Sequence, residues 1–334
     1  MPITNVNGVS LTLAVWAVDD HYDYEAAKQF DKPYISVTTL MKPLKQLVMS
    51  MRVPVEARTE DVEDYVARAL GHTIHDGIER SWKNYATNLR KLGYPKSVID
   101  HIHINPTDEE RKADPDMIPV FLEQRAYREL DGFVIGGKFD NVMEGHVEDT
   151  KSTTVWAWVF GTRDEEYILQ GGFYRWIDAA QPMPKITEDW MRVNFVFTDW
   201  QKSQARIKAD YPQRRTCHKD LKLLTEEEVE AFAREKLAAL KAHISTPESK
   251  LPRCTDEELW RSEPSYRYYA DPTKAKDPNA RSSKNFDNLA EANSHLASKG
   301  VGVIVTKPGE VKRCPYCAAF DICKQRREYF SDAD

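Results

Sequence analysis

The chain contains few cysteines, no long hydrophobic run and no excess of positive charge. Only five of its 334 residues are cysteine, and their uneven spacing excludes a disulfide framework. No apolar stretch approaches the roughly 20 residues that a membrane-spanning helix requires. The formal net charge is −6, so binding to nucleic acid would need a local basic surface. These absences favour a globular protein in a reducing compartment, and a hydrophobic fraction of 41% is enough to form its core.

The N-terminal segment also lacks basic residues, because no lysine or arginine precedes Lys28. A secretory signal begins with such residues, so the apolar segment from Val9 to Val18 does not match one. The partial alternation of its apolar side chains predicts a strand. We therefore expect a cytoplasmic protein that does not bind membranes.

The hydrophobic periodicity predicts a mixed α/β chain. Short apolar runs separated by glycine turns between 120 and 152 predict a strand meander, and an alternating core strand is expected at 191–198. Proline and polar residues predict loops at 101–119 and 264–285. The segments with a helical pattern are 61–70, 73–92, 164–180, 225–243 and 286–299.

Two carboxylates and a lysine stand close together in the meander. Alternate side chains of a strand share a face, so Asp149 and Lys151 point one way whereas Glu148 and Thr150 point the other. Asp140, nine residues before Asp149, is expected on or near the neighbouring strand. The two carboxylates can hold a divalent cation, and oxygen ligands suit Mg²⁺ or Mn²⁺. Lys151 would then lie beside a water bound to this cation.

Three further motifs accompany this pattern. The segment from Gly71 to His75 contains G-x-x-x-H and lies upstream in a helical pattern. Gln170 and Tyr174 follow downstream, and a spacing of four places them on one helical face. Near the C-terminus, the segment from Cys314 to Cys323 reads C-x-x-C-x-x-x-x-x-C, which favours metal binding.

The order of these motifs resembles the RecB-like branch of the PD-(D/E)XK nucleases. More narrowly, it is similar to the iron–sulfur members: CRISPR-associated RecB-like exonucleases, the nuclease domain of AddB and bacteriophage exonucleases. The segments Phe195 to Tyr211 and Cys254 to Trp260 are most similar to the phage branch. The resemblance covers roughly residues 35 to 327. It implies a restriction-endonuclease-like α/β core, in which helices flank a central mixed sheet, and an iron–sulfur clip at the C-terminus.

The resemblance also assigns roles to residues. The residues implied to be catalytic are Asp140, Asp149, Lys151, Gln170 and Tyr174. The implied metal ligands are His75, Asp140, Asp149 and the backbone carbonyl of Thr150. His72 is the neighbouring alternative to His75, but it lies about 100° away around the helix, and we favour His75. Glu123, which precedes the meander, is a candidate for supporting the ligands without binding the cation itself.

The cysteines near the C-terminus need a fourth ligand. From the spacing alone, their thiolates could bind zinc or an iron–sulfur cluster. Many iron–sulfur relatives carry the distant cysteine before the nuclease core, whereas this chain has no cysteine before Cys217. Cys217 and Cys254 are therefore the two candidates, and we favour Cys254 because it lies in the phage-like segment. The residues expected to hold a 4Fe–4S cluster are Cys254, Cys314, Cys317 and Cys323.

Three segments are expected: 1–58 as a substrate-binding cap, 59–250 as the nuclease core and 251–334 as the iron–sulfur segment packed on that core. Together they would form one structural domain. Basic side chains gather in three clusters, and we expect one of them to contact phosphate. The clusters are Lys202, Arg206, Lys208, Arg214, Arg215, Lys219 and Lys222; Lys274, Lys276, Arg281 and Lys284; and Lys312, Arg313, Lys324, Arg326 and Arg327.

The sequence thus predicts a metal-dependent exonuclease that prefers single-stranded DNA and acts in recombination, repair, replication or phage DNA metabolism. One alternative is an endonuclease, or an enzyme that processes DNA ends as in CRISPR adaptation. A second is a DNA-binding subunit with a vestigial site, which the intact set of Asp140, Asp149 and Lys151 argues against. A third is a zinc-stabilised binding module.

Overall fold

The computed structural model describes residues 3–20, 28–54, 60–277 and 279–331. The chain divides into two compact units. The first comprises residues 1–42 and 55–241, and the second comprises residues 43–54 and 242–334. The predicted segment boundary at residue 58 lies outside the described residues. No helix in the described part is both long enough and apolar enough to cross a bilayer.

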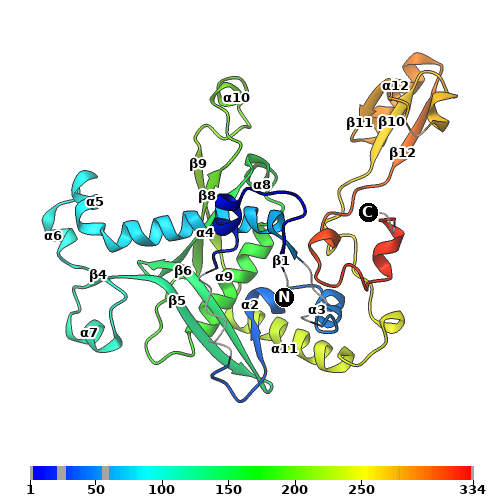
Figure 1. Cartoon of the computed structure of the whole chain (residues 1–334). Coiled ribbons are helices and arrows are strands. Elements are labelled where there is room, and N and C mark those ends of the chain that lie inside the picture. Colours follow the sequence, from blue (N-terminus) through cyan, green and yellow to red (C-terminus); the bar gives the residue numbers. More distant parts are fainter. Residues whose placement is uncertain (1–2, 21–27, 55–59, 278, 332–334) are drawn as a thin grey trace. The chain divides into compact units, whose positions relative to one another are not determined.

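The first unit is built around a mixed sheet (Figure 1). Seven of the described strands form it in the order β4-β5-β6-β7-β8-β9, with β2 paired to β6. The pairs β4–β5, β7–β8 and β2–β6 are parallel, and the other neighbours are antiparallel. The strands are β2 (Tyr34–Ser36), β4 (Ile102–Ile104), β5 (Ile118–Leu130), β6 (Phe133–Met143), β7 (His146–Thr153), β8 (Trp190–Phe197) and β9 (Thr216–Lys222). The meander and the core strand that the sequence predicts are confirmed.

Helices surround this sheet, and polar side chains fix where they begin. Asp61 caps α4 (Val62–Lys83) through a reciprocal capping box. Thr225 and Glu228 form the same arrangement at the start of α11 (Glu226–His243), as the sequence predicts. The other described helices of this unit are α1 (Leu11–Ala17), α2 (Val37–Leu40), α5 (Tyr85–Lys91), α6 (Lys96–Ile99), α7 (Asp108–Ala113), α8 (Val155–Phe160), α9 (Asp164–Asp178) and α10 (Lys202–Ile207). A short bridge joins β1 (Ile3–Thr4) to β3 (Glu60–Asp61).

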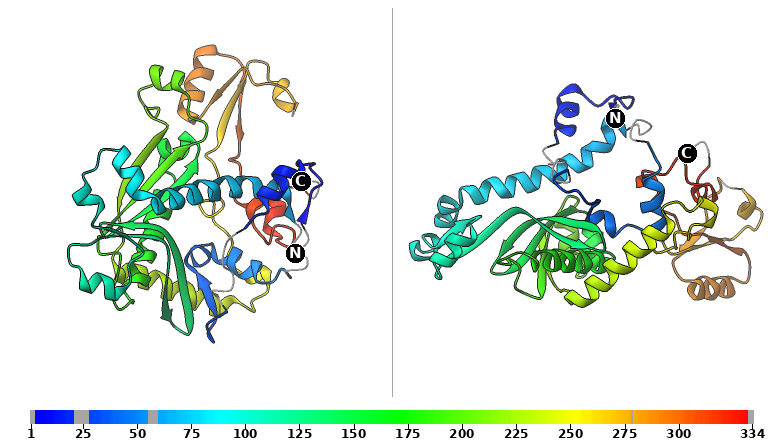
Figure 2. Two further views of the ribbon diagram at one scale, coloured as in Figure 1. Left: turned by 60° about the vertical axis from the view of Figure 1, so that its left-hand side comes forward. Right: turned by 90° about the horizontal axis from the view of Figure 1, so that it is seen from below.

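The helices α9 and α4 lie against opposite faces of the sheet (Figure 2). On α9, a Cβ added to Gly171 would lie 2.4 Å from Met191 Sδ, on the face of the sheet that also carries Asp149. On α4, a Cβ added to Gly71 would lie 3.7 Å from Ser152 Oγ, on the other face. The predicted mixed α/β fold, with helices flanking a central sheet, is therefore confirmed.

The prediction of a strand between Val9 and Val18 is wrong, because this segment forms α1. Ala17 is buried and belongs to a cluster with Tyr65 of α4, and Trp16 packs against the same cluster. Leu11 stays exposed, although the alternating pattern would have placed it on a buried strand face. Packing against a helix distant in sequence thus decides the conformation.

The predicted break inside the first helical region is also misplaced. The α4 helix runs without interruption through Gly71, and the break falls at Asn84, before α5. The segment 101–119, predicted as a loop, contains β4 and α7. Its prolines lie between these short elements or at the start of β5, so they do not prevent the pairing of Ile102 with Ile118.

The second unit contains α3 (Leu44–Ser50) and a small antiparallel sheet in the order β11-β10-β12. The segment 264–285, predicted as a loop, contains β10 and most of β11, so that prediction is wrong. The helix predicted at 286–299 is confirmed as α12, and Gly300 ends it with a φ of 67°. The remaining elements are β10 (Ser265–Tyr269), β11 (Lys284–Phe286), α12 (Leu289–Lys299), β12 (Val303–Lys307) and the 3₁₀ turns η3 (Glu248–Lys250), η4 (Lys274–Lys276), η5 (Cys314–Tyr316) and η6 (Gln325–Glu328).

Candidate active site

The site is located where two strands of the first unit separate. The ladder between β6 and β7 ends at the pair Asn141–Glu148. Nearer its start, β6 pairs with β2 instead of β7. Across the resulting gap, the backbone N–H of Thr150 donates to Asp140 Oδ2 at 3.3 Å. The separation leaves Asp140 and Asp149 facing a space that a continuous ladder would have closed.

A single groove of about 530 Å³ collects the predicted side chains of the first unit. They come from four elements: α4, β6, β7 and α9. The predicted residues that line the groove are His75, Asp140, Asp149, Lys151, Gln170 and Tyr174. Thr150 is buried between them, and His72 lies exposed at the rim of the same groove.

His75, Asp140 and Glu123 form a compact group. His75 Nδ1 lies 3.1 Å from Asp140 Oδ2. One potential ligand atom from each of the three residues lies within 4.8 Å of the others. Glu123 was expected only to support the ligands, whereas its carboxylate takes part in this group directly.

The backbone conformation of Glu123 explains how its side chain reaches the group. Glu123 stands between the ladder pairs Leu122–Asn141 and Gln124–Phe139, and therefore opposite Asp140. Its φ of 56° is in the left-handed region, which costs a non-glycine residue about 1–2 kcal/mol. This conformation changes the direction of the side chain relative to a regular strand. Strain of this kind is concentrated at functional sites in proteins.

Asp149 and Lys151 form a buried ion pair beside this group. Lys151 Nζ lies 3.0 Å from Asp149 Oδ1 and 2.8 Å from Oδ2. Burial lowers the pKa of Lys151, but the charge and hydrogen bond of Asp149, together with the charge of Asp140, outweigh burial, and the pKa is raised above its usual value. Burial raises the pKa of Asp149, and Lys151 opposes that change. Lys151 is therefore a protonated ammonium at neutral pH.

The neighbouring pair of His75 and Asp140 is held by charge as well. The hydrogen bond with Asp140 raises the pKa of His75. Burial raises the pKa of Asp140, but the hydrogen bond and charge of His75 outweigh it, so the pKa of Asp140 is lowered. Glu148 points to the other face as predicted, where it accepts a hydrogen bond from Asn194 at 2.9 Å.

The α9 helix contributes a polar pair and an aromatic ring. Gln170 Nε2 donates to Tyr174 Oη at 2.7 Å, so the predicted Q-x-x-x-Y spacing corresponds to a hydrogen bond. The ring of Tyr167 lies 5.7 Å from Lys151 Nζ. The sequence analysis missed Tyr167, although it stands three residues before Gln170 and seven before Tyr174 and thus shares their helical face.

Gly137 of β6 lies beneath Tyr174. A Cβ added there would be 2.8 Å from Tyr174 Cε1 and 2.9 Å from Ile177 Cδ1. We expect Gly137→Ala to lower the free energy of unfolding by about 1–3 kcal/mol through overpacking. Gly77 of α4 is the control, because nothing lies within 4 Å of an added Cβ, and Gly77→Ala should raise that free energy by about 0.5–1 kcal/mol. Urea unfolding checks both, and equal effects would contradict this account of Gly137.

The donor set of the groove fits a hard divalent cation. Around His75, three carboxylates (Glu123, Asp140 and Asp149) and its imidazole lie together, and no thiol lines the groove in the described part of the chain. Such oxygen-rich sets suit Mg²⁺ or Mn²⁺. The residues that would hold the ion are His75, Glu123, Asp140 and Asp149.

We expect Glu123→Gln to weaken binding of Mn²⁺ at least about tenfold, since it removes one anionic ligand without changing the side-chain volume; a tenfold change corresponds to about 1.4 kcal/mol. Calorimetric titration of Mn²⁺ into the purified variant measures the change. Glu129→Gln is the matched control, because Glu129 lies on the same strand and its side chain is 62% exposed. An unchanged Mn²⁺ affinity in Glu123→Gln would place Glu123 outside the site.

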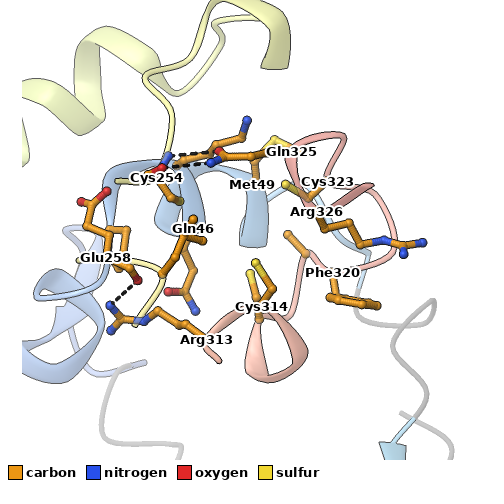
Figure 3. A pocket seen from close by; sticks show the side chains of 15 residues that line it. Gln46, Met49, Cys254, Glu258, Arg313, Cys314, Phe320, Cys323, Gln325 and Arg326 are labelled. Carbon is orange, nitrogen blue, oxygen red and sulfur yellow. Dashed lines mark hydrogen bonds between the residues drawn. The ribbon is translucent and has the colours of Figure 1, made fainter. Parts of the chain in front are cut away.

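A second candidate site is found in the second unit, where four cysteines line one pocket (Figure 3). Cys254 follows α11, and the other three, Cys314, Cys317 and Cys323, belong to the C-terminal segment. No disulfide joins any of the five cysteines, all of which are in the described part. Cys217 lies on β9 of the first unit and is not among the residues that line this pocket.

Hydrogen bonds hold Cys254 against the C-terminal segment. The buried Gln325 accepts from the Cys254 N–H at 3.1 Å and donates to the Cys254 carbonyl at 2.9 Å. Lys45 of α3 is 6% exposed and lies 3.5 Å from Glu248, which also accepts from the backbone N–H of Lys324 at 2.7 Å. The pocket is therefore enclosed by three chain segments that protein contacts already join.

The spacing of the sulfur atoms bears on what this pocket can hold. In the described part of the chain, the His75 group is the one set of three or more such residues whose ligand atoms all lie within 4.8 Å. A tetrahedral zinc ion with bonds of about 2.3 Å would bring its sulfurs to about 3.8 Å. The cysteines are thus more widely spread than a preformed zinc site requires. Burial raises the pKa of the Cys254 thiol to about 12 and of the Cys314 thiol to about 11, so both need a positive centre to ionise.

Comparison with known proteins adds little to this geometry. No family model and no curated protein match the chain. Among solved structures, the chain is similar to the crystal structure of SSO0001, with 14% sequence identity and a TM-score of 0.41. That match covers 72% of this chain and 89% of that chain. A similarity at this level assigns neither a family nor a function.

Proposed function

We propose that the chain is a metal-dependent deoxyribonuclease with a PD-(D/E)XK core of the RecB-like kind. The observation that carries the proposal is the convergence of His75, Asp140, Asp149, Lys151 and the Gln170–Tyr174 pair in one groove. Four elements contribute these side chains, and they are separated along the chain by as many as 99 residues (from 75 to 174). A chance cluster of surface charges would not bury a carboxylate–lysine ion pair beside a histidine–carboxylate pair.

Each side chain has a distinct task in this proposal. When bound, the cation would stabilise charge on the phosphate oxygens and lower the pKa of a water ligand. Lys151 carries a fixed positive charge at the side of the groove and stabilises the charge that develops during hydrolysis. Its raised pKa excludes it as a general base. Asp149 fixes the direction of the ammonium through their hydrogen bond.

The groove also offers contacts for the rest of a DNA strand. Trp16 of α1 lines it and donates from Nε1 to Thr73 Oγ1 at 3.2 Å, which fixes the orientation of its ring. Arg80 of α4 and Lys138 of β6 line it too. A ring and cations side by side are what single-stranded DNA binding uses, because bases stack and phosphates pair with charge. This supports a single-stranded substrate.

We further propose that Cys254, Cys314, Cys317 and Cys323 hold a 4Fe–4S cluster. The support is the set of four thiols around one pocket and a spacing wider than zinc requires. Thiolate ligation is the general way in which such clusters are held. The cluster would reinforce the hydrogen bonds of Gln325 and so stabilise the second unit.

The test of the proposed function compares linear with circular DNA. Incubation with Mg²⁺ or Mn²⁺ should shorten end-labelled linear single strands progressively, with much slower attack on intact duplex. Covalently closed single-stranded circles should survive. Equal initial rates on circles and linear strands would contradict an exonuclease and indicate an endonuclease. Absence of hydrolysis of every substrate by the metal-loaded protein would support a DNA-binding subunit instead.

A further inference from the structure

The second unit carries an insertion between two of the candidate cluster ligands. Residues 264–308 stand between Cys254 and Cys314 in the sequence. At the base, the N–H of Ser262 donates to Glu310 O at 2.9 Å and the N–H of Glu310 donates to Ser262 Oγ at 2.9 Å. The insertion has its own core, in which Tyr268, Phe286 and Ala292 are buried between its sheet and α12. We call residues 264–308 the inserted module (Figure 1).

The sheet of the inserted module has two chemically different faces. Tyr266 and Tyr268 of β10 point toward α12. By strand alternation, Ser265, Arg267 and Tyr269 point away from it. Lys307 of β12 pairs with Ser265 and therefore shares this second face.

A loop folds back onto the second face. Tyr269 is 4% exposed, and its Oη donates to the carbonyl of Ala280 at 3.4 Å. The loop between β10 and β11 therefore passes over the end of β10. It carries three exposed cationic side chains, Lys274, Lys276 and Arg281.

The charge of the inserted module is unequal between the two faces. Seven lysines and arginines stand against four aspartates and glutamates, a net charge of +3 in a chain whose total is −6. On the helix side the charges balance, because Lys284 and Lys299 are matched by Asp287 and Glu291. The whole excess therefore lies on the face opposite α12 and on the loop that adjoins it. The cations there are Arg267, Lys274, Lys276, Arg281 and Lys307.

These five cations are largely without carboxylate partners. In the described part of the chain, none of them lies within 4.0 Å of a carboxylate oxygen, and Lys274 interacts electrostatically with Asp271. The two carboxylates of the loop are engaged in its turns: Asp271 accepts from the N–H and hydroxyl of Thr273, and Asp277 accepts from the N–H of Asn279. Lys284 was grouped with the loop cations by sequence, but its Nζ lies 4.9 Å from the Phe286 ring on the helix side.

We propose that the face opposite α12 is a second DNA-binding surface, which holds the phosphate backbone through Arg267, Arg281, Lys307 and the two loop lysines. Charge complementarity identifies the occupant, since a chain with an overall excess of acidic residues concentrates unpaired cations on one face of one module. Flexible lysines and arginines on a sheet and its adjoining loop contact phosphates without selecting a sequence. The proposal rests on the proposed function only for the choice of DNA as the nucleic acid.

The test measures DNA binding separately from cleavage. Binding of a fluorescent single-stranded oligonucleotide is followed by anisotropy, without divalent metal, over a range of NaCl concentrations. The test variant is Arg281→Gln/Lys307→Gln, and the matched control is Lys284→Gln/Lys299→Gln, which removes the same charge from the helix side. Each single-strand phosphate contact contributes about 0.7 to the salt slope, so the test variant should lose about 1.4 in slope. Its Kd at low salt should rise at least about fivefold, and the control should change by less than twofold.

The outcomes separate this proposal from the proposed function. Equal losses of DNA affinity in both variants would show an effect of total charge alone. An unchanged DNA affinity in the test variant would show that DNA does not bind this face. Either result overturns the proposal whether or not the protein cleaves DNA. Conversely, selective loss in the test variant supports it even if no substrate is hydrolysed. Loss of binding to phosphatidylserine vesicles with unchanged DNA binding would assign the surface to anionic lipid and also overturn it.

Excision of the inserted module gives an independent check. The hydrogen bonds between Ser262 and Glu310 keep the two ends together, so a short Gly-Ser linker can replace residues 264–308. The excised protein should keep its cysteine pocket and lose at least as much DNA affinity as the test variant, because all five cations are removed. A folded excised protein with unchanged DNA affinity would overturn the proposal.

Discussion

Lys151→Ala is expected to reduce DNA hydrolysis by at least about 10³-fold, the scale seen when a group that stabilises transition-state charge is removed. The structural reason is that Lys151 donates a hydrogen bond to the predicted metal ligand Asp149 at 3.0 Å, which holds its charge beside the metal site. The measurement is the initial rate on end-labelled single strands, with binding followed separately by anisotropy. DNA affinity should change little, because phosphates elsewhere along the strand contact other cations.

The controls for this variant address its stability. Loss of one partner from a buried ion pair leaves the other charge uncompensated, so the assay is performed with Mg²⁺ present and folding is followed by circular dichroism. Lys112→Ala, at an exposed position on α7, should retain full activity. Undiminished hydrolysis by folded Lys151→Ala protein would remove the proposed mechanism.

The second large effect is expected from Cys254→Ser. Anaerobically purified protein should be brown and should contain about four irons and about four sulfides per chain, the composition of a cluster held by four thiolates. Cys254→Ser should lose colour and iron and should unfold at a lower urea concentration. The reason is that a group bound only by the folded chain adds its binding free energy to the free energy of unfolding, so its loss destabilises the protein.

Cys217→Ser is the matched control for the cysteine site. Cys217 lies on β9 in the first unit, so its replacement should change neither iron content nor the urea midpoint by a measurable amount. Colourless wild-type protein with one zinc per chain would overturn the cluster assignment. Loss of iron in Cys217→Ser and not in Cys254→Ser would make Cys217 the fourth ligand.

Local patterns predicted those parts of the fold whose conformation depends on local sequence. The alternation between residues 120 and 152 gave the meander correctly because each strand pairs with its neighbour in sequence. The spacing of Gln170 and Tyr174 placed them on one helical face for a similar reason. The relation of Asp149 to Lys151 follows from strand alternation alone.

Other features depend on contacts between distant segments, and there the sequence misled. The α1 helix is stabilised by α4, which begins more than forty residues later, so its own alternating pattern gave the wrong conformation. Glu123 joins the site through a left-handed backbone that no local pattern indicates. The first part of the inserted module, residues 264–285, was taken for a loop because β10 and β11 are short and Pro272 and Pro278 fall in the turn between them.

The second unit is formed by two stretches that are distant in sequence, and this has a consequence for synthesis on the ribosome. The segment 43–54, with buried Leu47 and Val48, belongs with residues 242–334. At about 5–20 residues per second, roughly 10 to 40 seconds separate the emergence of α3 from that of α11's end. During that interval the apolar side chains of α3 have no partner from their own unit. The nascent chain thus presents a chaperone-accessible segment early, and proteins truncated before residue 242 would lack the stretch with which α3 forms its unit.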